Sequence, residues 1–211
     1  ATLGTGANMT LESASDFPSS LLLPSRFSAA ASGNSCVAID KNVNRPSQVR
    51  YYSTSDGLQW NYSEAAPIGG LSVVATVSGN ITGFSVGTNA TQSGFYRLGS
   101  GGWALIAPNV DSASGADILP GSVVSLASNT AGTAILALVR EEVYDLNGNY
   151  SARRGLYSSA NWTVWTPVSL PDLRTAQPKF ESLIESVEWD GARFVMLLYP
   201  GRIFVSTDGK D

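Results

Sequence analysis

The amino-acid sequence predicts an all-β fold, and two features carry that prediction. The first is composition: of 211 residues, 21 are glycine and only 14% are charged, a balance typical of β-rich chains with many turns. The second is the recurrence of dipeptides that tolerate the positive φ angles of tight hairpins. These dipeptides are Asp56-Gly57, Asn147-Gly148, Asp190-Gly191 and Asp208-Gly209. Short strands joined by turns are therefore expected along most of the chain.

Between the turn signals lie stretches rich in β-branched, aromatic and small apolar residues, which favour strands. Several are apolar at every position, as in Phe194–Leu198, a pattern expected of a sheet that is packed on both faces. The predicted strands cover residues 35–40, 49–53, 71–78, 94–98, 123–127, 133–144, 155–159, 186–190, 193–199 and 202–206.

Internal repeats define the architecture further. Residues 51–60 (YYSTSDGLQW) and 156–165 (LYSSANWTVW) have the same interval between an aromatic residue and a final tryptophan. A copy shorter by one residue occupies 95–103, and a fourth copy at 203–211 stops before its tryptophan. A second echo precedes them at 33–39, 79–86 and 189–195. A period of about 40 to 60 residues is the range of propeller blades. The sequence thus predicts a β-propeller-like fold with about four recognisable antiparallel blades, the last one incomplete.

These repeats resemble the Asp-box (BNR-type) repeats of β-propellers, found in sialidases, sortilin-like receptors, photosystem assembly factors and many phage proteins. The family pattern is Ser-x-Asp-x-Gly-x-x-Trp. The copy that fits best places Ser53, Gly57 and Trp60 in register, with Ser55 at the aspartate position and Asp56 beside the glycine. The copy at 156–165 has Asn161-Trp162 in its turn, and the copy at 95–103 lacks an acidic residue. The resemblance covers most of residues 27–211.

The resemblance implies that the motif residues build the fold. A short polar side chain can accept backbone N–H bonds within the turn, glycine takes the left-handed conformation, and tryptophan packs between neighbouring blades. We expect this structural role, in preference to ligand stacking, for Ser53, Asp56, Gly57, Trp60, Trp103, Trp165, Asp208 and Gly209.

Two regions are expected: an extended N-terminal arm at 1–26, which lacks a strand pattern, and a propeller-like domain at 27–211. Because the fourth copy stops within its turn motif, we expect the propeller to continue in a longer polypeptide.

Composition argues against several classes of activity. The chain contains no histidine and one cysteine, Cys36, which excludes Ser-His-Asp and Cys-His catalysis, His-ligated metals and a disulfide framework within this portion. A net charge of −4 argues against nucleic acid and anionic membranes as partners. The apolar runs are too short for membrane insertion. We expect no cofactor.

Candidate chemistry is sparse. Residues 145–149 hint at a calcium loop, but Tyr150 stands where an EF-hand requires glycine and Leu156 where it requires glutamate, so no metal is expected. Glu141 and Glu142 are adjacent on a predicted strand and point to opposite faces, so they cannot form one catalytic dyad. No catalytic residue is assigned. The candidate binding residues are the basic doublet Arg153-Arg154 and the aromatic residues Tyr51 and Trp162.

The reading that best fits these observations is a non-enzymatic phage virion protein of the tail or attachment apparatus. Its expected partners are other virion subunits, including further copies of itself, and a host surface glycan or protein. One alternative is an Asp-box sialidase-like glycoside hydrolase, which needs three arginines for a carboxylate and a tyrosine–glutamate pair; no arginine here is placed by a motif. The other alternative is a secreted bacterial adhesin of the same fold, located outside the cell or at its surface.

Overall fold

The computed structural model describes residues 25–42, 49–88, 92–144, 150–169, 184–198 and 202–210. All regular secondary structure in these residues is β-strand. Within them there is no helix that could span a membrane. The chain is therefore an all-β protein over its described length, as its composition and turn dipeptides predict.

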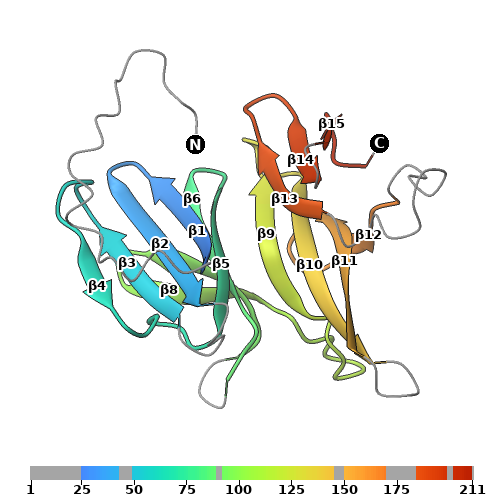
Figure 1. The fold of residues 1–211 in the computed structure, drawn as a ribbon, viewed down its shortest axis with the longest axis horizontal. Coiled ribbons are helices and arrows are strands. Elements are labelled where there is room, and N and C mark those ends of the chain that lie inside the picture. Colours follow the sequence, from blue (N-terminus) through green and yellow to red (C-terminus); the bar gives the residue numbers. More distant parts are fainter. Residues whose placement is uncertain are drawn as a thin grey trace.

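Four antiparallel sheets follow one another along the chain and form a ring resembling a four-bladed β-propeller (Figure 1). The predicted fold class is confirmed, including an incomplete last blade: blade 4 has three strands where each of the others has four. Blade 1 contains β1 (Ser25–Ser32), β2 (Ser35–Asn42), β3 (Val49–Thr54) and β4 (Asn61–Ser63). Blade 2 contains β5 (Leu71–Val77), β6 (Asn80–Ser85), β7 (Gly94–Gly99) and β8 (Gly102–Pro108).

The second half of the ring repeats this order. Blade 3 contains β9 (Ser122–Ser128), β10 (Ile135–Tyr144), β11 (Tyr150–Ser159) and β12 (Thr166–Pro167). Blade 4 contains β13 (Ile184–Trp189), β14 (Phe194–Leu198) and β15 (Arg202–Ser206). In each blade the strands pair in sequence order, so each sheet is a simple meander. Every predicted strand stretch overlaps an observed strand, whereas the predicted stretches do not include β1, β4, β6, β8 and β12.

The hydrophobic core consists of three clusters, each between two consecutive blades. Val37 and Ile39 of blade 1 pack with Val74 and Ile81 of blade 2. Phe84 and Phe95 of blade 2 belong to the cluster that also holds Ile135 and Val139 of blade 3. A third cluster joins Leu136 and Leu138 of blade 3 to Phe194 and Met196 of blade 4. Because an inner sheet meets a neighbour on each side, its middle strand is apolar on both faces.

The first strands of successive blades are also joined by serine hydroxyl groups. Ser28 Oγ of β1 donates to the carbonyl oxygen of Val74 (2.6 Å) and accepts from its N–H (3.0 Å). Ser125 Oγ of β9 makes the same pair of bonds to the backbone of Val187 in β13 (3.0 and 3.1 Å). These buried or half-buried bonds fix the position of one blade's first strand relative to the first strand of its neighbour.

The predicted N-terminal arm falls almost entirely outside the described residues. Strand β1 begins at Ser25, close to the predicted boundary at residue 27. The division into an arm at 1–26 and a domain at 27–211 stays a prediction.

Candidate functional site

The turn after β3 shows how the repeat motif works. The carboxylate of Asp56 accepts hydrogen bonds from the backbone N–H groups of Leu58 (2.8 Å) and Gln59 (2.9 Å). The hydroxyl oxygen of Thr54 accepts from the N–H of Gly57 (2.9 Å) and donates to the Asp56 carboxylate. Gly57 has a φ of 75°, in the left-handed region that glycine adopts most readily. A hydroxyl and a carboxylate thus close this hairpin turn.

The same arrangement recurs in blades 3 and 4. Asn161 Oδ1 accepts from the N–H groups of Thr163 (3.1 Å) and Val164 (3.0 Å), while the Ser159 hydroxyl accepts from the N–H of Trp162 (3.0 Å). In blade 4, Asp208 Oδ1 accepts from Lys210 N–H (2.9 Å), and the Ser206 hydroxyl accepts from Gly209 N–H (2.8 Å). The left-handed position is Trp162 (φ 70°) in one turn and Gly209 (φ 77°) in the other.

These turns revise the register of the motif in blade 1. The sequence alignment places Ser53 at the hydroxyl position and Ser55 at the acidic position, but the bonds are made by Thr54 and Asp56. Three consecutive hydroxyl residues, 53–55, make the register ambiguous in the sequence. In the structure, Ser53 is a half-buried strand residue of β3.

The backbone bonds to Asp56 have an electrostatic consequence. Because the N–H groups of Gln59 and Leu58 stabilise the charged form, they hold the pKa of the Asp56 carboxyl below its usual value. Donation from Ala192 and Arg193 lowers the pKa of Asp190 in the same way. Both carboxylates accept hydrogen bonds from backbone N–H groups of their own turns, and this suits a structural role better than proton transfer.

Four of the five tryptophans lie across a boundary between blades. Trp103 Nε1 on blade 2 donates to the hydroxyl of Tyr51 on blade 1 (3.4 Å). Trp165 of blade 3 stacks on Phe95 of blade 2, with ring centroids 5.2 Å apart and planes at 19°. Trp162 packs on the same phenylalanine. Trp189 of blade 4 donates to Thr130 of blade 3 (3.2 Å).

Trp60 differs from the other tryptophans. It follows the turn of blade 1 at the position that Trp165 holds in blade 3, but it is 50% exposed and belongs to none of the three core clusters. Among the described residues Trp60 packs against no other blade, and the expectation that it packs between blades stays a prediction.

In each blade we compare an apolar cross-strand pair between the second and third strands, on the face turned toward the next blade in blades 1 to 3 and on the equivalent face in blade 4. We call these four pairs the boundary pairs. They are Ile39–Tyr51, Phe84–Phe95, Leu138–Leu156 and Leu197–Ile203. In blades 1 to 3 both members are buried, with none more than 7% exposed, whereas Leu197 is 41% and Ile203 64% exposed.

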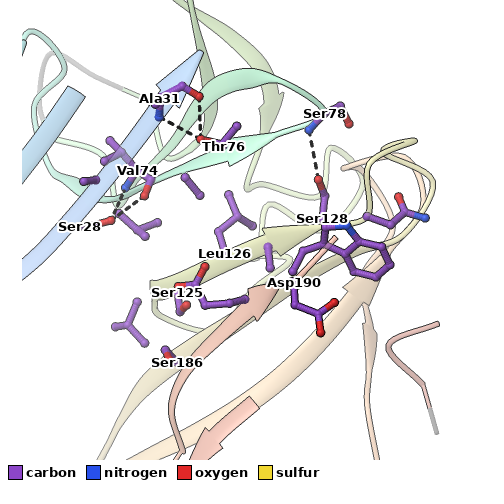
Figure 2. Close-up of a pocket in the computed structure, with 18 of the residues that line it drawn as sticks. Ser28, Ala31, Val74, Thr76, Ser78, Ser125, Leu126, Ser128, Ser186 and Asp190 are labelled. Atoms are coloured by element: carbon purple, nitrogen blue, oxygen red, sulfur yellow. Dashed lines mark hydrogen bonds between the residues drawn. The ribbon is translucent and has the colours of Figure 1, made fainter. Parts of the chain in front are cut away.

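The first strands of all four blades line a central channel of about 870 Å³. Its wall is rich in hydroxyl groups, contributed by Ser28, Thr76, Ser78, Ser125, Ser128 and Ser186. Figure 2 shows several of them bonding across the boundaries, as Ser78 N–H does to Ser128 Oγ (3.2 Å) and Thr76 Oγ1 does to Ala31. Many of the channel hydroxyls are therefore already engaged by the ring.

Charge in the channel comes from blades 3 and 4. Arg154 forms an ion pair with Glu185 (3.4 Å) and also donates to the carbonyl oxygen of Ile184. Glu188 is open to the channel yet surrounded by protein, and this partial desolvation raises its pKa. Glu185 and Glu188 of β13 both lie on the channel wall.

A second cavity, of about 490 Å³, opens at the boundary between blades 1 and 2, and we call it the aromatic groove. Its walls include Tyr51, Tyr96 and Trp103, with Gln92 and Ser53 at its polar positions. Burial raises the pKa of both tyrosines, so their phenols stay protonated at neutral pH. An aromatic wall with a few hydrogen-bonding groups is the usual composition of a small-ligand site.

The candidate binding residues lie in different places. Tyr51 is buried in the aromatic groove, Trp162 packs between blades 2 and 3, and Arg154 reaches the channel. Arg153 occupies a position in β11 opposite Glu141 of β10. The structure therefore does not bring these four residues into one site. The serines that join the first strands were missed, because an isolated serine carries no signal in a serine-rich sequence.

The described residues contain no group of three or more side chains suited to hold a metal ion. The segment 145–149, considered as a calcium loop, lies outside them. Arg154 is the one arginine among the side chains described on the channel wall, whereas a sialidase-like site needs three.

No family model matches the chain, and no curated protein matches its sequence. Among solved structures, one that matches is the crystal structure of the computationally designed Ika4 protein. The two are 9% identical over 88% of this chain and 92% of that chain, with a TM-score of 0.43.

Proposed function

We propose that this chain is a non-enzymatic structural protein of a phage particle, belonging to the tail or attachment apparatus, that docks on other virion subunits. The observation that carries the docking role is the exposed boundary pair of blade 4. Every other boundary pair is covered by a neighbouring blade, so Leu197 and Ile203 form a surface of the kind that this fold normally buries.

The assignment to a phage particle has separate support. Degenerate Asp-box turns resemble those of phage proteins, and three turns here use the same hydroxyl–carboxylate or hydroxyl–amide geometry. To test it, particles would be purified on a density gradient and their proteins identified by mass spectrometry. We expect the chain to co-sediment with infectious particles. Its absence from particles, or export through a cleaved signal peptide, would favour the secreted adhesin.

Recognition of a host surface glycan is a second role, favoured by the aromatic groove. Sugars bind with an apolar ring face against an aromatic side chain and with their hydroxyl groups hydrogen-bonded to polar side chains. Trp103 and Tyr96 offer the aromatic surface, and Gln92 lies exposed at the groove. A host attachment protein would need such a site.

Binding to an array of bacterial surface glycans measures this role. We expect a hit to weaken in Gln92→Ala and in Trp103→Phe, which keeps an aromatic ring but removes the indole N–H. Trp60→Ala, outside the groove, serves as the matched control. Binding that is lost only in the Trp60 variant would place the site elsewhere.

The sialidase-like alternative predicts a different result. A glycosidase would hydrolyse a fluorogenic sialoside, and the Arg154→Ala variant would lose that activity. We expect no turnover by either protein. Turnover that depends on Arg154 would replace the non-enzymatic assignment.

A further inference from the structure

We propose that a second copy of this chain covers the exposed boundary pair of blade 4 with the turn of its blade 1, in a head-to-tail contact. The inference deepens the proposed docking function by naming the partner. It concerns the association of the purified chain, whereas the function concerns its presence in particles, so either can fail without the other.

The three packed boundaries give the template for this contact. At the first, Trp103 of blade 2 reaches Tyr51, a member of the boundary pair of blade 1. At the second, Trp165 of blade 3 stacks on Phe95, a member of the boundary pair of blade 2. At the third, the turn of blade 4 approaches blade 3, where Gly209 lies against the side chain of Leu136. Each boundary therefore joins the turn region of one blade to the preceding blade.

The fourth boundary pair has the same strand pairing and the same apolar character as the other three. Ile203 pairs with Leu197 as Phe95 pairs with Phe84 and as Leu156 pairs with Leu138. Val205, next to Ile203 on the same face of β15, is also exposed. Among the described residues, no turn or tryptophan covers this apolar cross-strand surface of blade 4 as one covers each of its equivalents.

A turn and tryptophan of the covering kind are exposed on blade 1, at the other end of the ring. Trp60 follows the turn of blade 1 at the position of Trp165, and among the described residues it packs across no boundary. Around it, Leu58 and Tyr62 are exposed as well. Within one copy both surfaces are exposed, so they do not cover each other. Blade 4 of one copy and blade 1 of the next are complementary, which gives a heterologous contact that closes into a ring if the rotation permits.

Sedimentation velocity of the purified chain over a wide concentration range tests the proposal. We expect reversible association, weakened about 100-fold or more by Ile203→Glu and by Trp60→Glu, since each would bury a charge at the centre of the contact. Val164→Glu is the matched control: Val164 is as exposed as Ile203, at 64%, but lies on the turn of blade 3. Leu197→Glu and Trp60→Ala are second variants of the same two surfaces, should the first disturb folding in circular dichroism.

Every other result contradicts the proposal. A chain that stays monomeric at all concentrations lacks the contact. Association that Val164→Glu weakens as much as Ile203→Glu does is not specific to blade 4. Loss in the Ile203 variant with full association of both Trp60 variants would indicate a symmetric contact between two copies of blade 4, and not a head-to-tail one.

Discussion

Blades 3 and 4 carry the same surface in two different environments. In blade 3 the boundary pair Leu138–Leu156 is buried beneath blade 4, whereas in blade 4 the equivalent pair Leu197–Ile203 faces solvent. The strand pairing, the turn motif and the apolar character of the two pairs are alike. The difference therefore arises because a blade packs on this face of blade 3. The burial of a side chain in this fold depends more on packing between sheets than on strand pairing within a sheet.

The largest difference is expected on truncating the two leucines. Leu138→Ala should lower the free energy of unfolding by about 3 kcal/mol, because it leaves a cavity between blades 3 and 4. Leu197→Ala should change it by less than about 0.5 kcal/mol in dilute protein, where the side chain is exposed. Urea unfolding at low protein concentration measures both. Equal effects would mean that blade 4 is covered in the monomer.

The turns of blades 4 and 1 give a second contrast. A Cβ added at Gly209 would lie 2.9 Å from Leu136 of blade 3, whereas one added at Gly57 meets nothing within 4 Å. Both glycines have positive φ angles, so alanine costs about 1 kcal/mol of backbone strain at each. Gly209→Ala should lose about 1–2 kcal/mol more by overpacking. Thermal unfolding of the two variants makes the comparison, and a smaller loss at Gly209 would contradict the packed third boundary.

The smallest effect concerns pH and distinguishes the turn of blade 1 from that of blade 3. The folded pKa of Asp56 is lowered by backbone N–H bonds, so its contribution to stability is full above the unfolded value of about 3.9 and is lost as the pH falls through the folded value. Asp56→Asn keeps an oxygen acceptor, as Asn161 does in blade 3. The variant should therefore lose less stability between about pH 5 and pH 2 than the parent chain does.

Thermal unfolding across this pH range measures the difference, with Asp117→Asn as a control at an exposed carboxylate outside the repeat turns. A pH dependence that is unchanged in the Asp56 variant would show that the turn does not depend on the carboxylate charge.

Much of this fold could be predicted from local sequence. Tight turns need particular residues, so Asp56-Gly57, Asp190-Gly191 and Asp208-Gly209 identify turns whose glycines do adopt positive φ angles. The repeat spacing then gives the number of blades. Strand β1 was missed because SRFSAAAS contains mostly small residues, which acquire strand structure from pairing with β2 and from packing against β5.

The site was less predictable, because its properties come from contacts distant in sequence. The sequence near Trp60 and Trp165 does not show that Trp60 is half-exposed and Trp165 is stacked on Phe95, because packing against another blade decides the difference. Glu188 likewise has a raised pKa because the folded protein around it partly removes its carboxyl group from water. Sequence patterns describe a blade, whereas the boundaries and the channel exist only between blades.

A mixture of two variants tests the head-to-tail contact between two copies of the chain. Ile203→Glu damages the blade 4 surface and leaves blade 1 intact, while Trp60→Glu does the reverse. Measured by native mass spectrometry, each variant alone should be monomeric, and the mixture should form a heterodimer through the one contact in which both surfaces are intact. A mixture that remains monomeric, under conditions in which the parent chain associates, would show that blade 4 of one copy does not bind blade 1 of another.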